Sequence, residues 1–526
     1  MESKSSEAGG SLPASTAAAS STEVFAVHGA EPEVQAYAMA KYSRSALSMK
    51  ESLREISAQK AEKFLNTFYF QYGHRSIADL AHIALAIERL SILAAIVVVD
   101  EQRWDGQERS TRYQDFRRSG YYVPDFGGNS EAERLYRGSL DVLFSDYETL
   151  SERMWHHLAE QTPKPDDMKP EAYERTLKAR AFDITRYLLP LATNTSLGEI
   201  VNARTLETHV SHLLSHTHAE VRRLGELMKR AASEPAYNVN HEGWSRWVDR
   251  LRESDPRLAE ELAADLLRPV RVAPTLVKYA DPNQYEMQTR CALRQAARET
   301  MREAAIERAE PVELLEDDPL EVELAATLLY EHCHYPYRQI RNELEAAGTG
   351  WRRDIIELST RHRGKHDELL RAFEAGQRFR FDILMDIGGF RDMHRHRRCV
   401  QIEQGFTTAH GYDTPEEFER AGEARAYHAA MQRSAETVRL LLEGEGPEAE
   451  ENAQYAIPLG FRKRTLFKMD FAEAVYISEL RTAPAGHISY RRVAWAMFEE
   501  VARRYPALAG YFRAQDVREP VDLLRR

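Results

Sequence analysis

The feature that most constrains the fold of this chain is an internal repeat. Residues 190–214 read PLATNTSLGEIVNARTLETHVSHLL, and they can be set beside residues 458–482, PLGFRKRTLFKMDFAEAVYISELRT, at a constant offset of 268 residues with no gap. After a shift of one residue, HAEVRRL from His218 lies over HISYRRV from His487. Identity is sparse, but the paired arginines and the phasing of apolar residues agree, so we infer a diverged tandem duplication rather than a chance match.

The repeat indicates how the chain divides into domains. A length of 526 residues is large for one domain. We expect a disordered tail over 1–22, a first domain over 23–235, a connector that is partly helical over 236–275, a second domain over 276–514, and a C-terminal tail over 515–526. Each domain mixes long helices with a few strands, which predicts an α+β fold.

Composition narrows the class of protein. The net charge of -12 argues against a surface that binds nucleic acid, although it leaves room for a local anion pocket. Three scattered cysteines form neither a disulfide framework nor a metal motif. The longest apolar run, residues 90–99, is too short to cross a membrane and is expected to be a buried segment. We therefore expect a cytoplasmic protein that binds neither membrane nor nucleic acid.

Local patterns predict individual elements in both repeats. In repeat one, an aromatic stretch from Thr67 gives way to helical spacing at four apolar positions, Ile77, Leu80, Ala81 and Ala84. In repeat two, alternation of four apolar residues predicts a strand, at Phe379, Phe381, Ile383 and Met385. Residues 154–175 have no counterpart in repeat two and are interpreted as an insertion.

The strand in repeat two leads into a dense cluster, HRHRR at 394–398. His394 and His396 are two residues apart and lack accompanying ligands with metal spacing, so we predict no metal site there. His332, Cys333 and His334 could also touch a metal, but a turn with an ordinary buried cysteine explains them better. Acidic neighbours interrupt the positive run and weaken a nucleic-acid interpretation. A pocket for a planar or phosphorylated anion remains, because the donor fork of arginine matches such groups.

The cluster resembles a known signature. Arg395, His396 and Arg397, followed by Glu403, look like the flavin-binding RHR motif of the flavin-dependent thymidylate synthases, the ThyX family. That family continues into Glu-x-Ser-x-Arg-Tyr, whereas repeat two reads EQGFTTA. Repeat one supplies this portion as QERSTRY, with Glu108, Ser110, Thr111, Arg112 and Tyr113, yet has VVDEQRW where its own RHR should be.

The remaining family motifs divide between the repeats in the same way. Repeat one matches the Gly-His-x-Ser element with Gly73, His74 and Ser76, the arginine that grips the nucleotide with Arg186, and the Asn-x-Arg element near the flavin with Asn202 and Arg204. Repeat two has Gln454, Asp470 and Ala472 at the last three of these positions, but it alone keeps the substrate-activating arginine, as Arg481 against Leu213.

This division has a functional interpretation. In the ThyX family the active site is assembled between subunits, and the losses here sort along that division, which random decay would not be expected to produce. The resemblance therefore implies two tandem ThyX-like domains, each with long helices packed on a small antiparallel sheet, that build composite sites from both repeats. It also implies a homodimer that mimics the family's tetramer.

The resemblance implies a reaction and a role for each matched residue. A reduced FAD takes a methylene group from methylenetetrahydrofolate and passes it to C5 of dUMP to give dTMP, with NADPH as reductant. Arg481 would be catalytic, because it stabilises negative charge on the uracil ring. The expected cofactor-binding residues are Arg395, His396, Arg397, Ser76, His74, Glu108, Asn202 and Arg204. The expected substrate-binding residues are Ser110, Thr111, Arg112, Arg186 and Asp392.

One departure keeps two alternatives open. Asp392 replaces a phosphate-facing glutamine of the family, and its carboxylate would repel a phosphate unless Arg391 or Arg398 paired with it. The substrate is therefore dUMP or another uracil nucleotide, and the third interpretation is a non-catalytic scaffold that binds flavin or nucleotide.

Overall fold

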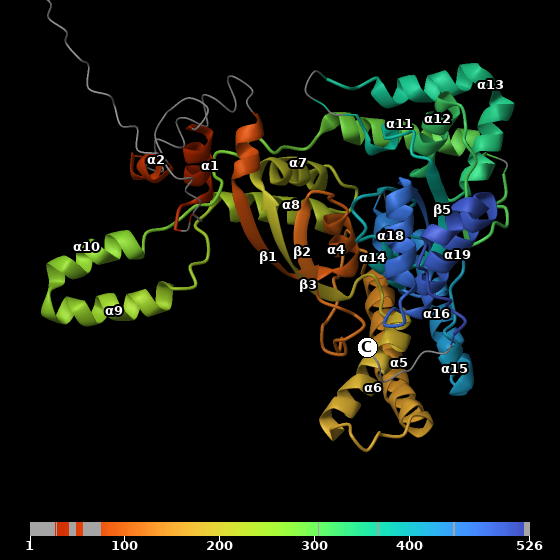
Figure 1. Ribbon diagram of the computed structural model, residues 1–526, viewed down its shortest axis with the longest axis horizontal. Helices are drawn as coiled ribbons and strands as arrows, with labels where there is room; N and C mark the ends of the chain where they lie inside the picture. Colours follow the sequence, from red (N-terminus) through yellow and green to blue (C-terminus); the bar gives the residue numbers. More distant parts are fainter. Residues whose placement is uncertain are drawn as a thin grey trace, which may run out of the picture.

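The two repeats fold into two units that lie side by side (Figure 1). The computed structural model describes residues 27, 29–41, 49–55, 75–302, 304–364, 367, 369–444 and 448–519. In the first unit, drawn in red to yellow, helices pack on a three-stranded sheet, and in the second, drawn in green to blue, helices surround a four-stranded sheet. The predicted α+β class is confirmed, because both sheets are antiparallel and both are small.

Repeat one is built on the sheet β1-β3-β2, whose strands are β1 (His82–Ser91), β2 (Trp104–Glu108) and β3 (Asn194–Asn202). His82 pairs with Asn202 and Trp104 with Val201, so β1 and β2 start, and β3 finishes, at the same end of the sheet. Its helices are α1 (Pro32–Lys41), α2 (Met49–Glu55), η2 (Arg75–Leu80), α4 (Ile92–Val99), α5 (Ser130–Gln161), α6 (Pro170–Thr185), η3 (Arg186–Leu188), α7 (Ala203–Leu214) and α8 (Ala219–Ser233).

Repeat two is built on the sheet β4-β5-β7-β6, whose strands are β4 (Val312–Leu314), β5 (Phe379–Asp386), β6 (Val400–Glu403) and β7 (Arg462–Met469). Its helices are α11 (Gln284–Thr300), α12 (Leu320–Tyr330), α13 (Tyr337–Thr360), η4 (Arg371–Phe373), α14 (Ile387–Met393), α15 (Glu416–Arg420), α16 (Ala424–Leu442), α17 (Ala449–Gln454), α18 (Phe471–Thr482), α19 (Ile488–Arg504) and η5 (Pro506–Tyr511). Between the repeats, α9 (His241–Ser254) and α10 (Pro256–Leu266) form a hairpin that projects from the body (Figure 1).

The buried helix of each repeat begins with the same kind of side-chain N-cap. Ser91 accepts a hydrogen bond from the Ala94 N–H at the start of α4, and Asp386 accepts one from the Gly389 N–H at the start of α14. Both side chains are N-caps, which satisfy a backbone donor that the first helical turn leaves open. This correspondence extends the repeat beyond the aligned segment.

Each cap is held by the last helix of its own repeat. Ser91 donates its hydroxyl to Glu220 of α8 at 2.6 Å, and its backbone N–H donates to the same carboxylate at 2.8 Å. In repeat two, the Ser489 hydroxyl of α19 donates to Asp386. The hydroxyl–carboxylate contact is thus kept while the two partners have exchanged places.

The repeats join through a short backbone segment that each of them contributes. Pro190 and Pro458, equivalent in the repeat, face each other in an antiparallel bridge. Two pairs of hydrogen bonds related by the repeat flank it: Leu191 N–H to Ile457 O and Leu459 N–H to Leu189 O, each 2.9 Å, then Ala192 N–H to Tyr455 O, 2.9 Å, and Gly460 N–H to Tyr187 O, 3.0 Å. Because these residues are buried and a single hydrophobic cluster spans both repeats, the two units share one core.

The structure corrects one sequence expectation. Helical spacing predicts a helix through Ala84, but the short helix η2 ends at Leu80 and residues from His82 form strand β1. The side chains of β1 alternate, with Ile83 and Ile87 buried between exposed neighbours. A short apolar run fits both periods, and pairing with β3 along nearly its whole length decides for the strand.

Two expectations about secondary structure are confirmed. The alternating residues of repeat two form β5, and most of the apolar run at 90–99, from Ile92 on, forms the buried helix α4. The insertion at 154–175 covers the end of α5 and the start of α6, the outer part of a helical hairpin (Figure 1). Within the described residues, no helix is both long and apolar enough to span a membrane.

Replacing Glu220 with alanine should destabilise the protein. Ser91 is fully buried, and the substitution would leave its N–H and its hydroxyl without their acceptor. An unsatisfied buried donor costs about 1–3 kcal/mol, so we expect the free energy of unfolding to fall by that amount in denaturant titrations. The matched control is Glu226→Ala on the same helix, an exposed acid that pairs with Arg223 and should change stability by less than about 0.5 kcal/mol. Equal effects from the two substitutions would mean that the Ser91–Glu220 contact does not stabilise the fold.

Candidate composite anion and flavin site

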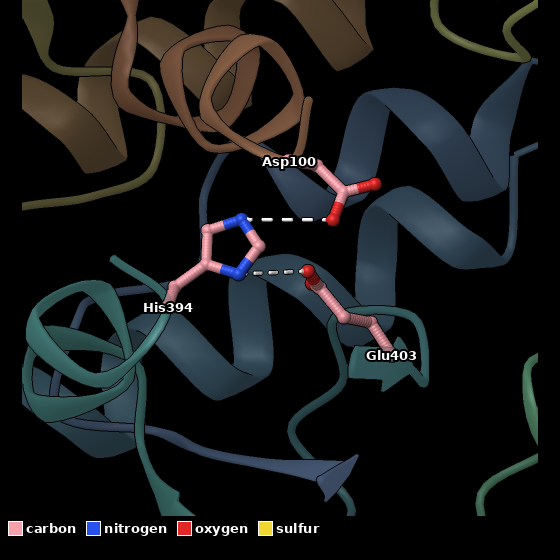
Figure 2. A group of neighbouring side chains, drawn as sticks. All are labelled: Asp100, His394 and Glu403. Atoms are coloured by element: carbon pink, nitrogen blue, oxygen red, sulfur yellow. Dashed lines mark ion pairs between the residues drawn. The ribbon is translucent and has the colours of Figure 1, made fainter. Parts of the chain in front are cut away.

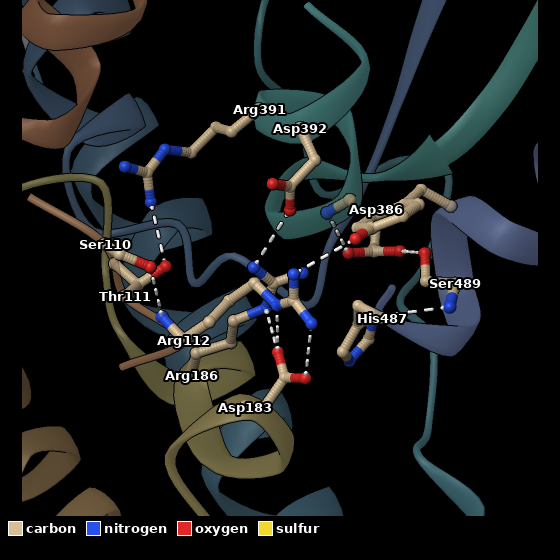
Figure 3. A network of polar contacts seen from close by, with 12 residues as sticks. Ser110, Thr111, Arg112, Asp183, Arg186, Asp386, Arg391, Asp392, His487 and Ser489 are labelled. Carbon is tan, nitrogen blue, oxygen red and sulfur yellow. Dashed lines mark hydrogen bonds and ion pairs between the residues drawn. The ribbon is translucent and has the colours of Figure 1, made fainter. Parts of the chain in front are cut away.

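An arginine cluster lies where the two repeats meet (Figure 3). Arg112 follows β2, and its guanidinium forms a two-point ion pair with Asp183 of α6, at 2.9 Å from Nε to Oδ1 and 3.2 Å from Nη2 to Oδ2. The same guanidinium donates to the Tyr490 hydroxyl and to the Ala485 carbonyl of repeat two, each at 3.0 Å. Arg112 is therefore held in a fixed orientation by both repeats.

Arg186 stands beside this pair with donors to spare. It begins the turn η3 after α6, and its side chain is about 1% exposed. Nη1 lies 3.3 Å from Asp392 of repeat two, and Nε lies 3.7 Å from Oδ1 of Asp183, an ion pair beyond hydrogen-bond distance. Nε and Nη2 are buried and have no hydrogen-bond partner among the described residues. Because buried polar groups are nearly always hydrogen-bonded, these two donors indicate a place for an anion.

Asp392 is paired with Arg186, at 3.3 Å. The two arginines considered as its partners from the sequence lie elsewhere: Arg391 contacts Glu108 and donates to the Thr111 hydroxyl at 3.2 Å, and Arg398 pairs with Asp470. The carboxylate is therefore offset by an arginine of the other repeat.

Four guanidinium groups act on the Asp392 carboxyl. Burial alone would raise its pKa, but the net pKa lies below its ordinary value because of Arg186, Arg112, Arg395 and Arg481. The pKa of Asp183 is likewise held well below its ordinary value, since His487, Arg186 and Arg112 together outweigh burial. Both carboxylates stay ionised and offset only part of the positive charge, so the cluster remains suited to an anion.

Arg481, the residue expected to be catalytic, reaches the same cluster from α18. Its Nε donates to Nε2 of His396 at 2.8 Å, and its guanidinium lies 5.6 Å from the centre of the Tyr490 ring. Tyr490 also receives the hydrogen bond from Arg112, so it connects the two arginines. His396 is about 5% exposed and has both ring nitrogens engaged, which leaves neither of them open to a ligand.

The other expected flavin residues lie near one end of the repeat-one sheet, where β1 and β2 start and β3 finishes. Arg397 pairs with Asp105 at 3.0 Å and lies 5.4 Å from the Trp104 ring, at the start of β2. Arg395 is exposed, and its side chain makes no hydrogen bond or ion pair with the other described residues, although its carbonyl accepts from the Arg397 N–H at 3.0 Å. Asn202 and Arg204 stand at the end of β3, the strand that pairs with β2. Asn202 caps α7 through the Thr205 N–H, and Arg204 pairs with Asp79 at 3.2 Å.

Of the remaining expected residues, two are placed by the structure and one lies outside the part that it describes. Ser110 accepts from the Arg112 N–H at 3.3 Å, so it shapes the turn that carries that arginine. Ser76 lies in η2. His74 lies outside the described residues.

Sequence reasoning missed several polar residues of the cluster. Asp183 stands one helical turn before Arg186, and this spacing was the available signal for it. His487 and Ser489 lie inside the aligned segment HISYRRV, and the match of His487 with His218 was a signal as well. Tyr490 lies in the same segment, but Val221 is its counterpart in repeat one, so the alignment gave no signal for a polar role. That role depends on how α19 packs against repeat one.

A cleft of about 1890 Å³ borders the cluster. Its walls include Asp183 and His487, together with Leu158 and Gln161 from the insertion of repeat one. The cleft therefore adjoins the arginine cluster at the residues that pair with its arginines. The volume of the cleft exceeds that of a nucleotide-sized pocket.

A second polar group joins the repeats at His394 (Figure 2). Asp100 lies 3.9 Å from Nε2 and Glu403 3.3 Å from Nδ1 of this imidazole, so the carboxylates face different ring nitrogens. Asp100 also pairs with Arg371, at 2.6 Å, and Glu403 with Lys463, at 2.5 Å. One ligand atom from each of the three residues lies within 4.8 Å of the others, but Arg371 and Lys463 already pair with the two acids. We therefore describe the group as a polar bridge between the repeats.

Comparison with known proteins places this chain in a family. The sequence model of the family described as "Thymidylate synthase complementing protein" matches residues 25–236 and 312–507. The chain belongs to this family, and the family occurs twice in it, once in each repeat.

Individual relatives are similar over most or part of the chain. A UPF0159 protein of Chlamydia pneumoniae is 28% identical over 96% of this chain and 93% of its own length, and a UPF0159 protein of Thermoplasma acidophilum is 24% identical over 88% and 90%. A flavin-dependent thymidylate synthase of Clostridium tetani is 23% identical over 40% of this chain and 80% of its own. Among solved structures, ThyX of Helicobacter pylori with FAD and dUMP matches 38% of this chain and 89% of its own, with 15% identity and a TM-score of 0.23.

Two buried groups beside the cluster should give opposite pH dependences of stability. Burial, then Asp413, raises the pKa of Asp386 to about 6, so this group favours folding at low pH and loses that contribution as pH rises from about 4 to 6. Burial lowers the pKa of His487 to about 3, so this group favours folding at high pH and destabilises the protein as pH falls from about 6.5.

In the wild type, Asp386 should lower the free energy of unfolding by about 2–3 kcal/mol as pH rises from 4 to 6, and Asp386→Asn should abolish this decrease. His487→Gln should abolish the decrease in the free energy of unfolding that His487 causes as pH falls below about 6.5. Denaturant unfolding at several pH values measures both, with the wild type subtracted. Slopes of the same sign for the two variants would show that one of the two groups is not buried in the state described.

Proposed function

We propose that this protein is a flavin-dependent thymidylate synthase that methylates dUMP at C5 to give dTMP, with FAD as cofactor and methylenetetrahydrofolate and NADPH as cosubstrates. The observation that carries the proposal is the pair of open donors on buried Arg186, beside Arg112 and within reach of Arg481 from the other repeat. Membership of the family and the flavin-dependent relative support the same reaction.

The 5′-phosphate would occupy the arginine cluster. Nε and Nη2 of Arg186 form no hydrogen bond within the described part of the chain, although Nε faces Asp183 at 3.7 Å, and both could donate to a phosphate. Ser110 stands at the same turn as Arg112. Asp183 and Asp392 hold the guanidinium groups in position before the ligand arrives, so little ordering remains to be done on binding. The paired Asp392 is thus compatible with a phosphate.

Arg481 would act on the pyrimidine. Its Nε is taken by His396, so its terminal nitrogens are the ones left to approach a uracil oxygen and stabilise the negative charge that makes C5 nucleophilic. A cysteine nucleophile is disfavoured in this chain, because burial raises the pKa of both Cys333 and Cys399 to about 12.

FAD would lie between Arg395 and Arg397 of one repeat and Asn202 and Arg204 of the other. The exposed guanidinium of Arg395, which pairs with none of the described residues, fits the electron-poor edge of a flavin, and Arg397 already bridges to the strand beside β3. When bound, the flavin supplies the one-carbon transfer and hydride chemistry. Glu108, Ser76 and His74 complete the proposed cofactor set.

A second candidate keeps the site and changes the substrate. Asp392 stands close to the proposed phosphate and replaces the amide that the family resemblance leads one to expect, which favours testing UMP beside dUMP. A homodimer remains our proposal for the quaternary state, and light scattering at micromolar concentration tests it.

Purified protein should be yellow with bound FAD and should release tritium from [5-³H]dUMP in the presence of methylenetetrahydrofolate and NADPH. Arg481→Ala should abolish release while FAD stays bound, because Arg481 acts on the substrate. Release from [5-³H]UMP alone would establish the second candidate. Colourless protein that FAD cannot reconstitute would leave only the scaffold interpretation, and full activity of Arg481→Ala would contradict its assigned role.

Arg186→Met should weaken dUMP binding by roughly 10- to 150-fold, which corresponds to about 1.5–3 kcal/mol for hydrogen bonds to a charged group. Isothermal titration with the FAD-loaded protein measures the dissociation constant. Gln454→Met is the matched control, because Gln454 holds the equivalent position in repeat two and should not affect binding. Unchanged affinity in Arg186→Met would contradict the phosphate assignment.

A further inference from the structure

Arg481 is one end of a chain of three side chains. Its Nε–H donates to Nε2 of His396 at 2.8 Å, and Nδ1 of the same imidazole lies 3.2 Å from Oε1 of Glu473. Glu473 lies two helical turns before Arg481 on α18 and is about 4% exposed. The carboxylate, the imidazole and the guanidinium thus form a continuous buried connection that ends at the arginine cluster.

The hydrogen bonds fix the tautomer of the imidazole. An arginine can only donate, so Nε2 of His396 must accept and the ring proton must sit on Nδ1, pointing at Glu473. Burial lowers the pKa of His396 below its ordinary value, so the ring is neutral near pH 7 and its two nitrogens have different roles. Without an acceptor at Nδ1, the other tautomer would set an N–H of the ring against the N–H of Arg481.

The other repeat lacks all three members of this chain. The offset of 268 sets Thr205 opposite Glu473 and Leu213 opposite Arg481, and superposing the caps Ser91 and Asp386 sets Glu101 opposite His396. A buried carboxylate is costly unless it is paired, so a glutamate at this position needs a partner. The acid occurs in the repeat that also has the histidine and the arginine.

We propose that Glu473 is a positioning residue for the reaction: it holds His396 in the tautomer that accepts from Arg481, and so directs the terminal nitrogens of Arg481 toward the substrate. The inference rests on the proposed function for the role of Arg481. The tautomer itself depends only on the geometry of this chain.

Kinetics of two substitutions test the role in turnover. Glu473→Thr introduces the residue of repeat one and removes the acceptor, so kcat for tritium release should fall about 10- to 100-fold, as small misplacements of a catalytic group do, while the KM for dUMP and FAD binding change little. Glu473→Gln keeps an oxygen that accepts from Nδ1 and should restore most of kcat. A purely structural role predicts no such rescue, and equal losses in the two variants would overturn the proposal.

A control separates positioning from loss of helix stability. Asp470 caps the start of α18 through the Glu473 N–H and does not contact His396. Asp470→Ala should lower the unfolding midpoint while kcat stays unchanged. If both Glu473→Thr and Asp470→Ala lowered kcat in proportion to the stability that each one removes, Glu473 would act only by stabilising α18.

The tautomer gives a readout that does not require turnover. In protein labelled with ¹⁵N-histidine, the resonance that disappears in His396→Gln should show a protonated Nδ1 in the wild type and in Glu473→Gln, and a mixture of tautomers in Glu473→Thr. A protonated Nε2 in the wild type would overturn the inference even if the enzyme were active. Conversely, the expected tautomer in protein that binds FAD but releases no tritium would contradict the proposed function and leave the geometry of the chain standing.

Discussion

The backbone pairing of residues 187–192 with 455–460 is the constraint on which the rest of this structure depends. It is symmetric under the repeat, it is buried, and it fixes one repeat against the other at the residues that follow Arg186 and Gln454. Gly460 donates to the carbonyl of Tyr187, the neighbour of Arg186, and Gly388 at the start of α14 donates to the carbonyl of Leu459. Two backbone links therefore separate Arg186 from the helix that carries Asp392, which is why these side chains meet although they are far apart in the sequence.

The same symmetry creates two composite positions, and their side chains differ in charge. One gathers Arg112, Arg186, Arg395 and Arg481 around two aspartates. Superposing the caps Ser91 and Asp386, and keeping the offset of 268 around and after Pro190, sets Thr407, Gln454, Asp100 and Leu213 at the equivalent places of the other. Asp100 pairs with Arg371 and faces His394, so it links the repeats. The arginines of the first position thus have no arginine counterpart in the second.

Much of the fold and of the site follows from the sequence. The offset between the repeats reveals the pseudosymmetry, and the motifs around Arg112, Arg186 and Arg481 identify side chains that the structure brings together within one chain. The helix expected through Ala84 fails because strand pairing is a tertiary property that a short apolar run does not encode. The pairing of Asp392 with Arg186 rather than with its neighbours in sequence depends on how α14 packs against repeat one, as does the part played by Tyr490.

The central claim is that the two repeats of one chain, and not those of two different chains, complete the site. Complementation between inactive variants tests it most directly. Arg186→Met and Arg481→Ala place the defects in different repeats, so mixed oligomers purified after co-expression with two affinity tags should release no more tritium from [5-³H]dUMP than the sum of the separate variants. Recovery of activity in the mixed oligomers would mean that the repeats complement each other between chains, and it would contradict a site completed within one chain.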